Sequence, residues 1–151
     1  MALKDIIQND MKAALLGGNR FEGDVLRNLK AAILNEEVAT GRRETGLSDA
    51  EIEKIIAREV KKRHESVKLY EANDRAELAD EEKKEIAVLN TYLPQQLSED
   101  EIRDIAKIVI ESMDNVGPSL MGRVIGGVKA KVGNTADGAT VARVVKELLH
   151  S

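Results

Sequence analysis

Apolar side chains recur along this chain at spacings of three and four residues, the pattern that gives an α-helix one buried face. The pattern predicts helices at residues 3–15, 25–38, 49–73, 75–93, 102–113, 118–132 and 139–149. No stretch alternates apolar and polar residues with the enrichment in β-branched residues that is typical of a strand. The sequence therefore predicts an all-α protein.

Two segments, 47–52 and 97–102, carry the same helix-start signal, L-S-x-x-E-I. The serine is the expected N-cap, and the glutamate three residues later can bond back to the serine amide. The leucine before the serine can pack on the isoleucine that follows the glutamate. We therefore interpret Ser48 and Ser98 as helix caps and not as nucleophiles.

A proline at position 94 marks the expected division of the chain. The residue before a proline is disfavoured in the α conformation, so the fourth helix should end there. We expect residues 1–94 to form an N-terminal four-helix unit that includes a long helical hairpin. Residues 97–151 should form a small C-terminal three-helix bundle, near the lower size limit for a unit that folds on its own core.

One charged residue lies on an apolar line of the third helix. Arg63 falls between Val60 and Val67, and a guanidinium in that position must find a carboxylate or backbone carbonyls. Glu36 continues the apolar line of the second helix, with Glu37 beside it. We expect a structural ion pair between Arg63 and Glu36 or Glu37.

Composition narrows the possible functions. The chain has no cysteine, so a disulfide framework, a thiolate metal site and a cysteine nucleophile are all excluded. No apolar run approaches the roughly 20 residues of a membrane span, and residues 1–5 lead into no secretory signal. We expect a soluble cytoplasmic protein with no membrane partner.

The residue types that usually carry chemistry are sparse. His64 and His150 are the only histidines, and they do not form a metal-ligand pair. The acidic runs at 80–82 and 99–101 are interpreted as helix-start or exposed residues. Neither phosphate-binding glycine motif is present. The sequence predicts no catalytic residue, no metal and no cofactor.

The last part of the chain, in contrast, carries a net positive charge. Residues 117–151 hold five basic and two acidic residues in a chain of net charge −4. Gly133 is expected to close one helix and Asp137 to cap the next, whose N-terminus favours phosphate. Lysine and arginine beside such a turn suit contact with an RNA backbone, although a solvated basic face is the alternative. The RNA-binding candidates are Arg123, Lys129, Lys131, Gly133, Asp137, Gly138, Arg143 and Lys146.

Several runs of sequence extend over nearly the whole chain and together resemble one family. They are R-N-L-K-A-A-I-L-N-E-E at 27–37, E-V-K-K-R-H-E-S at 59–66, Y-L-P-Q-Q-L-S at 92–98 with Glu101 following, M-G-R-V-I-G at 121–126, A-D-G at 136–138 and V-K-E-L-L at 145–149. The chain resembles the YqeY-like family. The Y-L-P-Q-Q-L-S run and the M-G…A-D-G tail are specific in combination.

The resemblance implies an all-helical fold whose C-terminal domain is shared with the B subunit of the glutamine-dependent aminoacyl-tRNA amidotransferase. In that enzyme the tail domain helps to bind and position tRNA, and the amide-transfer chemistry lies in other domains. The resemblance thus implies tRNA as a partner, without catalysis by this chain alone.

Three functional hypotheses follow. The first is a non-catalytic tRNA-binding adaptor to tRNA-modifying or amidotransferase machinery. The second is a protein-interaction module that docks through the helical stalk, residues 48–93. The third is an accessory component of a glutamine-dependent carbon–nitrogen ligase, whose partner would supply the ammonia and ATP chemistry. The oligomeric state stays open.

Overall fold

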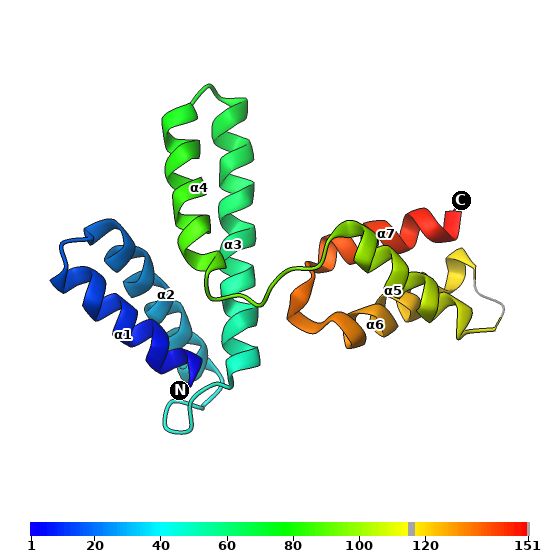
Figure 1. Cartoon of the computed structure of the whole chain (residues 1–151), viewed down its shortest axis with the longest axis horizontal. Helices are drawn as coiled ribbons and strands as arrows, with labels where there is room; N and C mark the ends of the chain where they lie inside the picture. The colour runs from blue at the N-terminus through cyan, green and yellow to red at the C-terminus, as the bar shows by residue number, and fades with distance from the viewer. Residues whose placement is uncertain (115–116, 151) are drawn as a thin grey trace. The chain divides into compact units, whose positions relative to one another are not determined.

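The computed structural model describes residues 1–114 and 117–150, and that part of the chain is all-helical without a strand, so the fold-class prediction is confirmed (Figure 1). The chain divides into two compact units, Met1–Leu93 and Pro94–Ser151. The loop expected at 114–118 lies partly outside the described residues, because 115 and 116 are among those not described. The α-helices are α1 (Leu3–Leu16), α2 (Arg20–Ala39), α3 (Asp49–Ala72), α4 (Ala76–Asn90), α5 (Glu99–Glu111), α6 (Met121–Val132) and α7 (Gly138–His150).

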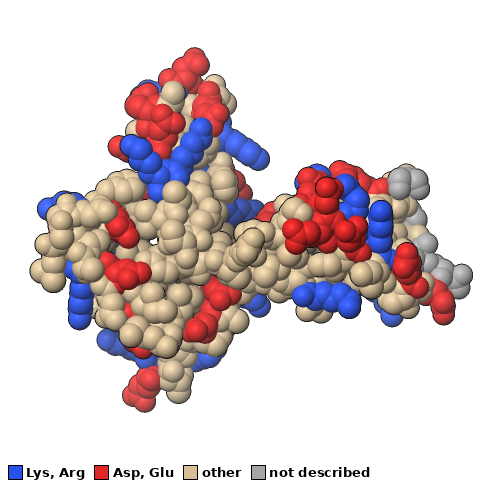
Figure 2. All heavy atoms as spheres, in the orientation of Figure 1, with Lys and Arg blue, Asp and Glu red and all other residues tan. Residues whose placement is uncertain are grey.

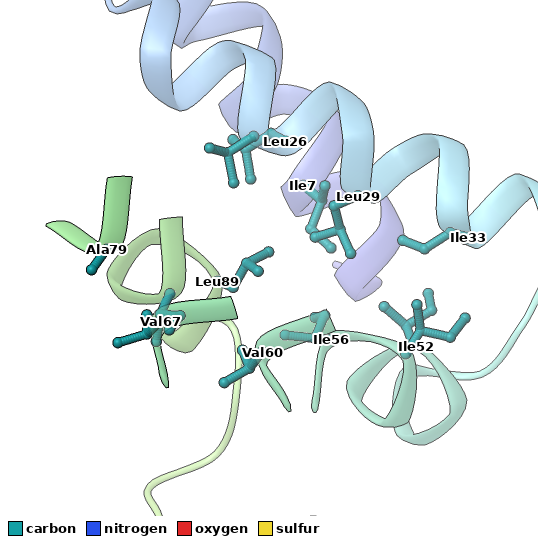
Figure 3. Packing of buried hydrophobic residues seen from close by; sticks show 13 residues of the cluster. Ile7, Leu26, Leu29, Ile33, Ile52, Ile56, Val60, Val67, Ala79 and Leu89 are labelled. Atoms are coloured by element: carbon teal, nitrogen blue, oxygen red, sulfur yellow. The ribbon is translucent and has the colours of Figure 1, made fainter. Parts of the chain in front are cut away.

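The first unit is made of two helical hairpins, α1 with α2 and α3 with α4 (Figure 1). Aliphatic side chains from all four helices meet between the hairpins, as Figure 3 shows. At Gly23 of α2, a Cβ would lie 2.5 Å from Cδ2 of Leu15, so a larger residue there would require the half-exposed Leu15 side chain of α1 to move. Core residues that are at most 1% exposed include Ile7, Leu26, Leu29, Ile33, Ile52, Ile56 and Leu89.

The predicted partner of Arg63 is wrong. Arg63 is partly buried, with its side chain 15% exposed, but its ion pairs are with Glu59 at 3.7 Å and Glu85 at 3.6 Å. Its Nη1 also donates to the carbonyl of Glu59 at 3.0 Å. The line of α3 that carries Arg63 packs mainly against α4, so the acceptors come from α4 and from the preceding turn of α3.

The two glutamates of α2 have other partners. Glu36 lies 4.0 Å from Nη2 of Arg58. Glu37 is 1% exposed, and both of its carboxylate oxygens accept from Nζ of Lys4 on α1, at 3.0 and 2.8 Å. A buried carboxylate that loses its partner is costly, so this pair ties the start of α1 to the end of α2.

The loop between α2 and α3 is held by Arg42, which forms two hydrogen bonds to the Glu51 carboxylate. Ser48 accepts from the amide of Glu51, and the glutamate side chain accepts from the amide of Ser48, which confirms the predicted capping box. The hydrogen bond from Arg42, followed by those from Ser48, lowers the pKa of Glu51 to about 2. The loop thus depends on an ionised Glu51.

The second unit packs α5, α6 and α7 around a core rich in valine. At Gly127 of α6, a Cβ would lie 2.9 Å from Cγ1 of Val109, so α5 and α6 meet closely at this glycine. A 3₁₀ turn, Pro118–Leu120, precedes α6, and a second, Gly133–Thr135, follows it. Ser98 accepts from the amide of Glu101 and caps α5, as predicted. The amide of Leu97 donates to the Thr135 carbonyl at 2.7 Å.

Replacing Lys4 by methionine should lower the free energy of unfolding by about 2 kcal/mol, because the buried carboxylate of Glu37 loses its cation. The double variant Lys4→Met/Glu37→Leu should recover most of that loss. Urea unfolding at neutral pH measures both effects. Lys12→Met changes an exposed lysine of the same helix and is the control. An equal loss in the control would contradict the assignment.

Arg42→Gln should destabilise the protein in a pH-dependent way. In the folded protein the pKa of Glu51 is about 2, whereas the ordinary pKa of a glutamate is 4.5. The stability that Arg42 supplies through Glu51 is therefore fully present above pH 4.5 and is lost as the pH falls toward about 2. Urea unfolding from pH 7 to pH 3 should show a deficit of the variant that shrinks with acidification. A deficit that stays constant would rule out Glu51 as the cause.

Candidate nucleic-acid interface

Four of the predicted basic residues lie on the surface of α6 and α7. Arg123, Lys129, Lys131 and Lys146 are exposed, and no ion pair joins them to any residue that the structure describes. On α6 they do not share one face, because Lys129 and Lys131 lie about 160° apart around the helix axis. They therefore flank the buried valine face on its two sides.

The turn between α6 and α7 requires its glycine. Gly133 has φ 55° and ψ −130°, a conformation that only glycine adopts without strain. It closes α6, as predicted, and the chain passes through the 3₁₀ turn to Asp137. This reversal brings the last turn of α6 beside the first turn of α7.

Lys129 reaches across this turn to the start of α7. Its Cε and Nζ lie 3.5 Å from the position that a Cβ on Gly138 would occupy. Asp137 caps the helix, since its Oδ2 accepts from the amide and the hydroxyl of Thr140, both at 3.1 Å. The predicted N-cap is confirmed. An internal carboxylate already takes one of the amides that were expected to favour phosphate.

Arg143 is the candidate whose surroundings differ most from expectation. It pairs with Glu99 of α5 and, at 3.2 Å, with Glu147 on its own helix. The hydrogen bond from Arg143 lowers the pKa of Glu99, and the same bond raises the pKa of Arg143. Glu147 also accepts from Arg103 at 2.9 Å. Arg143 is therefore neutralised by acids rather than presented to a ligand.

The charge expected for the C-terminal region also changes once α5 is included. Residues 94–151 hold eight acidic and seven basic residues, so the unit is not basic as a whole. On the face drawn in Figure 2, acidic side chains gather over the start of α5, and a separate group of basic side chains lies over α6. The exposed cations Arg123, Lys129 and Lys131 thus lie on more than one face of α6, with Lys146 exposed on α7, and we call the three cations of α6 together the α6 surface.

The sequence did not predict the acidic partners of Arg143, which are Glu99 and Glu147. Glu99 was interpreted only as a helix-start residue, and it meets Arg143 across 44 positions of the chain. No local pattern carries that information. Glu147 could have been found, because it lies four residues after Arg143, a spacing at which side chains meet on a helix.

The first unit holds one other polar feature, a shallow hollow of about 320 Å³ lined by Asp10, Ala13, Ala14, Asn19 and Glu22. The Tyr92 hydroxyl donates to Asp10 at 2.6 Å. Burial, and then this hydrogen bond, raises the pKa of Tyr92 above its ordinary value. The contact fastens the end of α4 to α1.

Within residues 1–114 and 117–150, no cluster of histidine, cysteine or carboxylate side chains could hold a metal ion. Over the same residues, no helix has both the length and the apolar character needed to cross a bilayer. The cytoplasmic location stays a prediction.

These features define a class, an all-helical protein of two units whose C-terminal three-helix bundle carries a local cationic surface. The sequence model of the YqeY-like protein family matches residues 4–149, and the chain belongs to this family.

Two curated relatives carry the name "Altered inheritance of mitochondria protein 41, mitochondrial". The protein from Clavispora lusitaniae is 27% identical over 105 residues, which cover 68% of this chain and 59% of the relative. The protein from Vanderwaltozyma polyspora is 26% identical over 87 residues, which cover 58% of this chain and 46% of the relative. The chain spans about half the length of these relatives.

Removing the acids that neutralise Arg143 should strengthen the binding of polyanions. Glu99→Gln/Glu147→Gln frees Arg143, while Arg103 keeps Asp100 at 3.7 Å, and should raise affinity for tRNA by roughly fivefold at low salt. Fluorescence anisotropy with labelled tRNA measures the change.

The control is Asp104→Asn/Glu111→Gln, which removes two exposed acids of α5 that have no recorded ion pair with a described residue. It should change affinity by no more than about twofold. Equal gains in the two variants would mean that total charge, and not release of Arg143, governs binding.

Proposed function

We propose that this protein is a non-catalytic adaptor that binds folded RNA, with tRNA as the favoured class, through the α6 surface. The adaptor would present tRNA to tRNA-modifying or amidotransferase machinery. The observation that carries the proposal is the group of exposed cations at Arg123, Lys129 and Lys131, which have no recorded ion pair with a described residue.

The charge pattern supports contact with a phosphate backbone. Lysine is a flexible point charge that approaches phosphates readily, and release of counterions from RNA favours such contacts. The Lys129 ammonium beside the start of α7 adds to the positive potential of that helix end. Both contributions come from side chains that have no described competing carboxylate within ion-pair distance.

The mode of recognition follows from what α6 and α7 lack. Neither helix contains phenylalanine, tyrosine or tryptophan, and His150 at the end of α7 is the one aromatic ring of the two helices, so few side chains there can stack on unpaired bases. Contacts to phosphates and sugars fix orientation and carry little sequence information. We therefore propose recognition of the shape of a folded RNA, which suits tRNA better than a specific single-stranded sequence.

The adaptor role draws on the family resemblance. The resemblance implies a C-terminal domain shared with the amidotransferase B subunit, in which that domain helps to bind tRNA and amide transfer takes place in other domains. Membership of the YqeY-like family extends over residues 4–149 and so includes the α6 surface. Binding without chemistry is the activity that this domain would bring to a complex.

Lys129→Ala/Lys131→Ala should weaken tRNA binding by roughly tenfold at low salt and should lower the slope of log affinity against log salt by about 2. Anisotropy titrations between about 50 and 200 mM salt measure both quantities. Lys12→Ala/Lys84→Ala removes two exposed lysines of the first unit and should leave the slope nearly unchanged. Absence of any binding of tRNA by the unaltered protein at low salt would refute the proposal.

A further inference from the structure

The outward face of α3 carries a row of basic residues. Lys54, Arg58, Lys61 and Lys68 follow one another at intervals of four, three and seven residues. At 3.6 residues per turn these positions stay within about 80° of one another. They are all exposed, on the side of α3 opposite the buried Ile52 and Ile56. We call them the α3 row.

Most of the α3 row is not neutralised. Lys54, Lys61 and Lys68 have no ion pair with any residue of the described ranges 1–114 and 117–150. Arg58 lies 4.0 Å from Glu36, at the outer limit of an ion pair, and both side chains are more than a third exposed. Glu65 is the one acid on the same line of the helix. The row keeps a net positive charge over about 21 Å of helix.

The partner helix of the hairpin has the opposite character. The outward face of α4 presents Glu77, Asp80 and Glu81, with Lys84 as its exposed cation. In Figure 2, basic side chains lie over both helices of the hairpin, and acidic side chains gather at the end where α4 begins. A polyanion is attracted to one edge and repelled from the other, so the hairpin can select both the ligand and its orientation.

We propose that the α3 row is a second RNA-binding surface, which contacts the phosphate backbone of the folded RNA in the proposed function, on which this inference rests. The row has no aromatic side chain, because Tyr70 of α3 packs against the core of the first unit. Lysines at these spacings can each reach a phosphate without reading a base. The surface therefore adds affinity and salt dependence but little sequence preference.

The test compares two triple variants of the full chain that remove the same charge. Lys54→Gln/Lys61→Gln/Lys68→Gln removes the lysines of the α3 row. Lys12→Gln/Lys30→Gln/Lys84→Gln removes three exposed lysines from other faces of the same unit. Glutamine resembles lysine in helix propensity, and no removed lysine has a recorded ion pair, so both variants should fold as the parent does. Circular dichroism and urea unfolding verify this.

Labelled tRNA is titrated at several salt concentrations with the parent, the two triple variants and Lys129→Ala/Lys131→Ala. The α3 variant should lower the salt slope by about 2 to 3 and weaken binding by at least roughly tenfold at low salt. The matched control should lie within about threefold of the parent.

If the parent binds tRNA but the α3 variant and its control behave alike, the α3 row is not an RNA surface and the proposed function still stands. If the α3 variant loses binding and the α6 variant does not, the α3 row is supported and the α6 surface is refuted. If the parent does not bind tRNA at any salt concentration, both proposals fall.

Discussion

Aliphatic packing between helices is the constraint on which this structure depends. With only 2% aromatic residues, each helix must bury a stripe of isoleucine, leucine, valine or alanine against its neighbours. Close approach at Gly23 and Gly127 brings the helices near enough for such small side chains to interlock. Because each buried stripe is narrow, a large part of every helix surface is left to charged residues, which form 33% of the chain.

Whether a basic side chain is available to a ligand then depends on whether it pairs with an acidic side chain of a neighbouring helix. Arg143 faces Glu99 of α5 and is neutralised, although Arg143 and Lys146 are both exposed on α7. The lysines of the α3 row are exposed to solvent. The exposed acidic residues of the neighbouring helix α4 lie on the outer face of α4 and do not pair with these lysines. Residues of one type therefore have different roles, and the difference arises from packing between helices rather than from the local sequence.

This distinction also explains what the sequence could predict. The 3.6-residue period and the capping signals located the helices to within a few residues, since both are local properties. The period placed Arg63 on a buried line correctly but could not tell which helix would cover that line.

The candidate site shows the same limit. Gly133 and Asp137 were assigned from turn chemistry, and their conformations agree with that assignment. The basic character of residues 117–151 was correct for that segment but not for the folded unit, because α5 brings five acids that lie outside that segment of the chain.

A net charge of −4 does not prevent an RNA partner. At physiological ionic strength charges are screened over about 8 Å, so a phosphate responds to the side chains within a few ångströms and hardly to the total. What matters is the separation of basic from acidic faces, which α3 and α4 achieve within one hairpin. An acidic protein with such local surfaces would hold RNA more weakly than a basic one but would release it readily as salt rises, which suits an adaptor that must pass its ligand on.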